Sequence, residues 1–94
     1  MAKLIVRHRV ANFEAWKSVF DGMTALRKSH VWLGHTVVRD AADPNVVTII
    51  NHMRDLAGAK AYGGSAELRA AMAKGGIEGA PEVMFCEEHE DKTY

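Results

Sequence analysis

The spacing of apolar residues changes along this chain in an order that few folds accommodate. Alternation typical of strands and the spacing typical of helices follow one another. In chain order the runs are a strand over 3–10, a helix over 13–27, strands over 33–39 and 46–53, a helix over 55–73 and a strand over 82–87. This βαββαβ order predicts an α+β, ferredoxin-like domain, a four-stranded antiparallel sheet in the order 4-1-3-2 with both helices on one face.

Local signals set the ends of these elements. Asn12 is suited to cap the first helix, whose apolar stripe ends near Arg27, a residue favourable at the negative end of the helix dipole. Gly63-Gly64 is expected to interrupt the second helix, with Ser65 capping its second half. Pro81 is expected to open the last strand.

Apolar residues occupy both faces of the predicted sheet. In the strand over 46–53, Val47, Ile49 and Met53 lie on one side and Ile50 lies on the other. The helices cover one face only, and a chain of 94 residues buries a smaller share of its surface than a larger domain does. We therefore expect the other face to meet a second copy of the chain in a homodimer.

Charge and cysteine content argue against several classes of protein. Lys and Arg together number 12, as do Asp and Glu, so the chain lacks the positive excess that drives binding to nucleic acid. The single cysteine, Cys86, cannot form an internal disulfide, and no apolar run of about 18 residues indicates a membrane span. We expect one cytoplasmic domain over 1–94, with a polar tail over 88–94 and no nucleic-acid or membrane partner.

Several motifs together resemble one superfamily. They are Leu-Ile-Val-Arg-His-Arg-Val in the first strand, Asn-Phe-Glu-Ala-Trp-Lys at the first helix, Gly34-His35, Asp43-Pro44-Asn45, and Gly79-Ala80-Pro81-Glu82. Over residues 3–86 the chain resembles the dimeric α+β barrel superfamily, within it the antibiotic-biosynthesis-monooxygenase-like and polyketide-cyclase-like small bacterial proteins. The resemblance implies two sheets that close into a barrel in the dimer and a small-molecule cavity between each sheet and its helices. It leaves the activity open, because members of one fold carry different chemistries.

Each of the first three strand-like runs carries one histidine: His8, His35 and His52. His8 alternates with Leu4 and Val6, which places it on an apolar face. A lone histidine there is more often a hydrogen-bonded core residue than a catalyst, but three on adjacent strands favour a functional site.

The hairpin register decides whether these histidines meet. His35 and His52 share a face if the numbers of paired residues have an odd sum such as 87, and lie on opposite faces if the sum is even. The loop over 40–45 leaves both registers open. His30 in a connection and His89 in the tail are expected to be solvated.

Two chemistries suit such histidines. A neutral imidazole removes a proton beside a carbonyl or stabilises the developing oxyanion, as an aldol-type ring closure or an oxygenation without a cofactor requires. Alternatively, three imidazoles hold Zn²⁺, Cu²⁺ or Fe²⁺, although we assign no metal site. The candidate walls of an aromatic-binding cavity are Trp32, Tyr62, Trp16 and Phe20, the last two of which also suit a plain core.

Other functions of this fold lack their residues here. RNA-binding domains need aromatic residues on the first and third strands, and 3–10 and 46–53 contain none. Metallochaperones need paired cysteines, and the glycine-rich segments 63–65 and 75–79 lack the Lys-Ser/Thr of a phosphate loop. Arg7 and Arg9 lie on the face opposite His8 by parity, which suits the dimer interface or its rim.

The predicted function is an enzyme of the monooxygenase or cyclase type that acts without haem, flavin or another cofactor. Its expected ligand is a small aromatic or polycarbonyl metabolite, with the histidines transferring a proton. The main alternative is a non-catalytic binding or accessory protein, and a histidine-ligated metal site is another. A cavity within reach of His8 favours the enzyme, whereas a cavity filled by Trp16, Phe20 and Met23 favours the accessory role.

Overall fold

The computed structural model describes residues 1–23, 25, 27 and 32–94. Its sheet has four antiparallel strands in the order β2-β3-β1-β4, which confirms the predicted topology. The elements are β1 (Ala2–Val10), α1 (Phe13–Asp21), β2 (Trp32–Arg39), β3 (Val46–Met53), α3 (Leu56–Gly63), α4 (Ala66–Lys74) and β4 (Ile77–Glu87).

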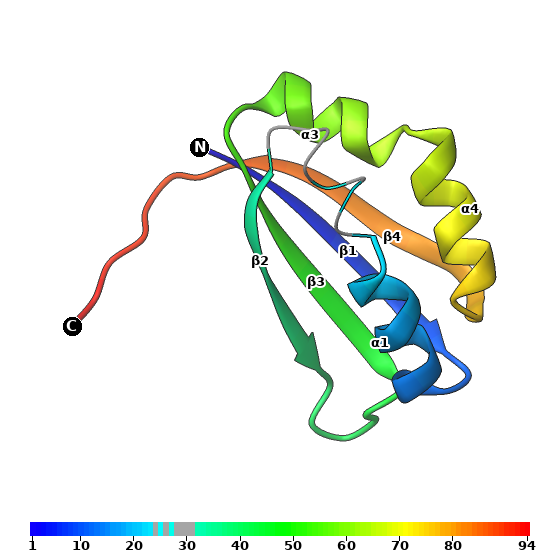
Figure 1. The fold of residues 1–94 in the computed structure, drawn as a ribbon. Helices are drawn as coiled ribbons and strands as arrows, with labels where there is room; N and C mark the ends of the chain where they lie inside the picture. The colour runs from blue at the N-terminus through cyan, green and yellow to red at the C-terminus, as the bar shows by residue number, and fades with distance from the viewer. Residues whose placement is uncertain (24, 26, 28–31) are drawn as a thin grey trace.

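The helices α1, α3 and α4 lie together on one face of the sheet (Figure 1). Alternate residues of β1 and β3 point into this layer: Leu4, Val10, Val47 and Met53 are fully buried. Trp16 and Phe20 of α1, Ala59 and Tyr62 of α3 and Leu68 of α4 complete the core. Among the described residues no helix is long and apolar enough to cross a membrane.

The first helix is shorter than the sequence predicts. Asn12 caps it as expected, with its side-chain oxygen accepting a hydrogen bond from the Ala15 N–H at 3.0 Å. The helix ends at Asp21, and the N–H of Gly22 returns to the Ser18 carbonyl at 3.2 Å. The prediction that this helix continues to Arg27 is therefore wrong.

The second helical region is interrupted, as predicted. Asp55 caps α3 by accepting from the Gly58 N–H at 2.7 Å, and Ser65 caps α4 by accepting from the Leu68 N–H at 3.2 Å. A β-carbon at Gly63 would lie 2.9 Å from the ring of Phe85, so only glycine lets α3 pack this closely on β4.

The last strand begins earlier than the sequence predicts. β4 starts at Ile77, and Pro81 lies inside it rather than at its start. Arg9 pairs with Glu78 and Arg7 pairs with Glu82, so three residues of β4 stand opposite His8 alone. In this bulge Gly79 has a φ of 75°, and the missing N–H of Pro81 interrupts no regular ladder.

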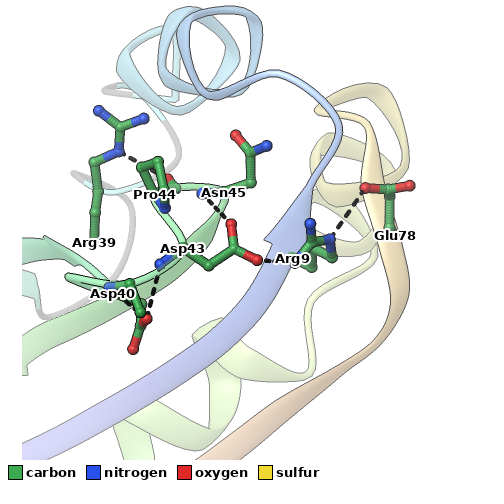
Figure 2. A network of polar contacts seen from close by, with 8 residues as sticks. Arg9, Arg39, Asp40, Asp43, Pro44, Asn45 and Glu78 are labelled. Carbon is green, nitrogen blue, oxygen red and sulfur yellow. Dashed lines mark hydrogen bonds and ion pairs between the residues drawn. The ribbon is translucent and has the colours of Figure 1, made fainter.

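Polar contacts organise the β2–β3 hairpin (Figure 2). The Asp40 carboxylate accepts hydrogen bonds from the N–H groups of Ala42 and Asp43, both at 3.0 Å. The Asp43 carboxylate accepts from the Asn45 N–H at 3.1 Å and from the guanidinium of Arg9 on β1. These are the local hydrogen bonds that favour Asp and Asn in turns, and they tie the hairpin tip to the neighbouring strand.

The other face of the sheet has no helix over it. Val38 and Met84 are each 45% exposed there, and Ile5 and Ile50 lie between them, partly covered by neighbouring side chains. Residues 88–94 form neither helix nor strand, are exposed, and extend away from the sheet (Figure 1).

Candidate active site

The register of the sheet separates the three candidate histidines. From Gly34 to Arg39 the paired residues of β2 and β3 have numbers that sum to 86, so His35 pairs with Asn51 and Gly34 pairs with His52. His8 and His35 therefore lie on the helix-covered face, whereas His52 lies on the other face. The even-sum alternative is the one found.

His8 is buried, only 5% exposed, among apolar side chains. Its ring meets the indole of Trp16 edge to face, with 5.4 Å between centroids. Its Nδ1 is buried and has no hydrogen-bond partner among the described residues. Burial lowers the pKa of His8, and the backbone of His8 itself offsets part of this effect. The ring is thus neutral and holds a free polar atom.

A small cavity of about 40 Å³ lies between the sheet and the helices, and His8 forms part of its wall. The sheet contributes Val6, His8, Ile49 and Asn51, and α1 contributes Trp16, Val19 and Phe20. Met23, Tyr62, Leu68, Ala71 and Met72 close the remaining sides. Two methionines in the wall give it adaptable side chains, because Met has three rotatable bonds and no branch.

Three of the four candidate wall residues, Trp16, Phe20 and Tyr62, line this cavity. The fourth, Trp32, lies behind the wall with its ring parallel to that of Tyr62, 6.4 Å away. Burial raises the pKa of Tyr62, so its hydroxyl stays protonated near neutral pH.

His35 is exposed at the border of this region. Its ring stacks on Trp32 at 5.0 Å and meets Phe20 edge to face at 4.9 Å. Loss of hydration lowers the pKa of His35, and the positive charges of Arg27 and Lys17 lower it further. The rings of His8, Trp16, Phe20 and His35 therefore form a continuous series of contacts. His8 lines the cavity and His35 does not, so the two histidines do not reach the same ligand position.

His52 lies in a polar group on the uncovered face. Its Nδ1 accepts a hydrogen bond from Lys3 Nζ at 2.6 Å, because a lysine ammonium only donates, and its Nε2 lies 3.3 Å from Thr36 Oγ1. Lys3 also pairs with Glu88 at 3.0 Å. Both ring nitrogens of His52 are occupied by protein partners.

Two residues of the site were missed by the sequence analysis. Asn51 is 2% exposed; it accepts from the Trp32 indole N–H at 3.1 Å and donates to the Leu4 carbonyl at 3.0 Å. Arg27 is 4% exposed and lies against Phe20 and Trp32. The spacing held a signal for Arg27, since it follows Phe20 by seven residues and so continues the apolar stripe.

The geometry does not assemble a metal site from the three histidines, because His52 lies on the face away from His8 and His35. The described residues contain no group of three His, Cys, Asp or Glu side chains placed to hold an ion. On the uncovered side, a polar hollow of about 200 Å³ is lined by Arg7 and Arg9, which pair with the carboxylates of β4 and the hairpin. His89 is exposed, and His30 lies outside the described residues.

Comparison with known proteins gives a likeness in structure. No family model matches the chain, and no curated protein matches it at a significant level. SnoaB from Streptomyces nogalater, a cofactor-independent oxygenase, superposes with a TM-score of 0.77 at 14% identity, covering 96% of this chain and 94% of that one. A candidate antibiotic biosynthesis monooxygenase from Caulobacter crescentus gives 0.74 at 20% identity, covering 95% and 90%.

A third solved structure, Rv0793 from Mycobacterium tuberculosis, gives a TM-score of 0.70 at 12% identity, covering 98% of each chain. These matches span nearly the whole chain, and the shared βαββαβ sheet is the feature that they have in common with it. The chain thus has the fold of the antibiotic-biosynthesis-monooxygenase-like proteins, as its sequence motifs suggest.

Proposed function

We propose that this protein is an enzyme that acts without a cofactor on a small aromatic or polycarbonyl metabolite, with His8 as its general base. The observation that carries the proposal is the free Nδ1 of His8 in the wall of an apolar cavity. A buried polar atom without a partner is costly, so its retention favours a role with a ligand. SnoaB, an oxygenase of the same fold, supports this type of reaction.

The chemistry begins with a proton transfer. The neutral ring of His8 takes a proton from a carbon next to a carbonyl, which leaves an enolate in the cavity. The hydroxyl of Tyr62, which lines the same cavity and stays protonated, is suited to donate a hydrogen bond to the enolate oxygen. The apolar wall excludes water and strengthens both interactions.

Two reactions can follow from that enolate. In an oxygenation, O₂ oxidises a ring CH₂ to C=O, one oxygen atom entering the product and the other leaving as water. In a cyclisation, the enolate carbon attacks a second carbonyl and the proton returns to the new alkoxide, so no oxidant is consumed. Oxygen uptake separates the two.

A binding or accessory role is the second candidate, and the size of the cavity favours it. Trp16, Phe20 and Met23 stand in the wall and leave only about 40 Å³, whereas ligand pockets are usually several-fold larger, about 300 Å³ or more. An enzyme therefore requires the methionine side chains to move when a ligand enters. Ligand binding with no turnover would favour the accessory role.

The test compares two histidines in one sheet. With a panel of phenolic polycyclic ketones, oxygen consumption and product formation are measured for the wild type, His8→Gln and His52→Gln. We expect His8→Gln to keep the fold and lose about 10²–10⁴-fold in rate, and His52→Gln to remain within about threefold of the wild type. An equally active His8→Gln variant would contradict the proposal.

We also infer a homodimer that forms through the uncovered face, on which Ile5, Val38, Ile50 and Met84 leave apolar surface in the isolated chain. In this arrangement Lys3, His52 and Thr36 lie at the interface of the two sheets. A cytoplasmic location is proposed as well, from the one cysteine and the absence of a long apolar helix among the described residues.

A further inference from the structure

Arg27 is a buried cation to which the proposed reaction assigns no role. It is 4% exposed, and its Nε and Nη2 atoms are buried with no hydrogen-bond partner in the part of the chain that the structure describes. A guanidinium stays protonated in proteins, so it cannot relieve this burial by releasing a proton. A buried charge without a paired anion is among the most costly features that a fold can retain.

Aromatic rings hold the guanidinium in position. Its Cζ lies 3.7 Å from the centroid of Phe20 and 4.5 Å from that of Trp32. Such contacts engage the flat faces of the cation and leave its N–H groups directed outward in its own plane. A hydrogen bond to the Tyr62 hydroxyl uses one of these directions, and Nη1 is the nitrogen left to donate it.

The two unpartnered nitrogens form one edge of the guanidinium. The N–H bonds of Nε and Nη2 run nearly parallel, and this is one of the edges with which arginine binds both oxygens of a carboxylate. The chemistry of the free edge therefore matches an anion with two acceptor oxygens.

No carboxylate of the described residues occupies that edge. Asp21 is the carboxylate whose charge acts on Arg27, with a smaller effect than that of Tyr62, and it pairs with Lys17 Nζ at 2.6 Å on the exposed side of α1. The other ionisable groups near Arg27 are Lys17 and His35. Lys17 is itself positive and His35 is neutral, so neither neutralises the charge of Arg27. The positive charge of Arg27 is thus left for a molecule from outside.

We propose that the Nε–Nη2 edge of Arg27 binds the carboxylate of the ligand, so that the ligand is a small planar aromatic acid. Phe20 and Tyr62 contact Arg27 and also line the cavity that contains His8, so an acid held here directs its ring system toward that cavity. The inference rests on the proposed function for its ligand site, and it adds the charge of the ligand and the residue that selects it.

The test uses a matched pair of probes, 2-naphthoate and its neutral amide, with affinity measured by calorimetry and by quenching of tryptophan fluorescence at pH 8. We expect the wild type to bind the acid at least about tenfold more tightly, the ratio that a charge-assisted bidentate pair supplies. Arg27→Met is expected to bind both probes equally. Lys17→Met, which removes an exposed cation 5.9 Å from the Phe20 ring, is the control and keeps the preference.

Two further measurements guard against a folding artefact. Arg27→Met removes an unpaired buried charge, so its Tm is expected to equal or exceed that of the wild type. If it does not fold, Arg27→Lys retains the charge without the two-nitrogen edge and is expected to lose most of the preference. Equal affinities in the wild type, a preference that survives in the Arg27 variants, or no binding of either probe at millimolar concentration would each overturn the inference.

These outcomes are independent of turnover. His8→Gln is expected to keep the preference for the acid over the amide, whatever it does to the affinity for both. An Arg27-dependent preference without any reaction would leave this inference standing and remove the proposed enzyme. A His8-dependent reaction on substrates that show no preference for acids would do the reverse.

Discussion

A histidine side chain has opposite surroundings on the two faces of the sheet. On the covered face His8 is 5% exposed and its Nδ1 has no partner among the described residues. On the uncovered face His52 is only partly buried, yet Lys3 and Thr36 engage both of its ring nitrogens. The chain leaves a polar atom unsatisfied on the face where satisfaction matters most for stability, and this contrast supports our proposals of a ligand site on the covered face and a dimer interface on the other.

The largest expected effect distinguishes a packed face from an open one. Leu4 is fully buried, and Leu4→Ala is expected to lower the free energy of unfolding by about 2–5 kcal/mol, because it leaves a cavity in the core. Val38→Ala, at a 45% exposed position of the open face, should cost about 0.5 kcal/mol in the monomer. Urea unfolding at low protein concentration measures both, and similar losses would remove the contrast.

The open face is tested by introducing a charge. Ile50→Asp is expected to weaken the homodimer by about 100-fold or more, since the carboxylate would be buried without a partner in the interface. Sedimentation velocity across a range of concentrations measures the dissociation constant. A wild-type chain that is a stable 10.4 kDa monomer at micromolar concentration would show that this face has another purpose.

The free energy of unfolding gives a second test of the difference between His8 and His52. His8→Leu removes an unpaired polar atom and is expected to raise the free energy of unfolding by about 1 kcal/mol. His52→Ala removes two hydrogen bonds and is expected to lower it by about 1 kcal/mol. Changes of equal sign in the two variants would show that the faces do not differ in this way.

The smallest expected effect is a dependence of stability on pH. The pKa of His8 is lowered on folding from its ordinary value of 6.5, so the unfolded chain binds more protons in the range just below 6.5. The contribution of His8 is present in full above pH 6.5 and is lost as the pH falls through the folded pKa. Comparing wild type with His8→Gln over pH 5–8 should show a steeper slope in the wild type, because His35, whose pKa is also lowered, contributes equally to both.

Alternation in the first strand was sufficient to predict the burial of His8, because Leu4 and Val6 share its face and a strand repeats every two residues. The relation of His35 to His52 was not predictable in this way. A hairpin loop of six residues fits either parity, and the extra residue at Leu33, where the register shifts, lies beyond what periodicity reports.

Arg27 shows a different limit. Helical spacing places it on the same stripe as Phe20, but the sequence analysis assigns it only a favourable charge at the negative end of the helix dipole. Helix α1 instead ends at Asp21, and the stacking on Phe20 and Trp32 comes from tertiary packing. Contacts between distant segments decide such positions, and a single sequence does not contain their geometry.

The bulge opposite His8 also changes the exposed edge of the sheet. β4 is an edge of the sheet, and eleven residues in an uninterrupted extended strand would offer a template on which another chain could add by main-chain pairing. The turn of the backbone at Gly79 and the missing donor of Pro81 divide that edge into two short pieces. The bulge that places three residues of β4 opposite His8 therefore also disfavours aggregation through this edge.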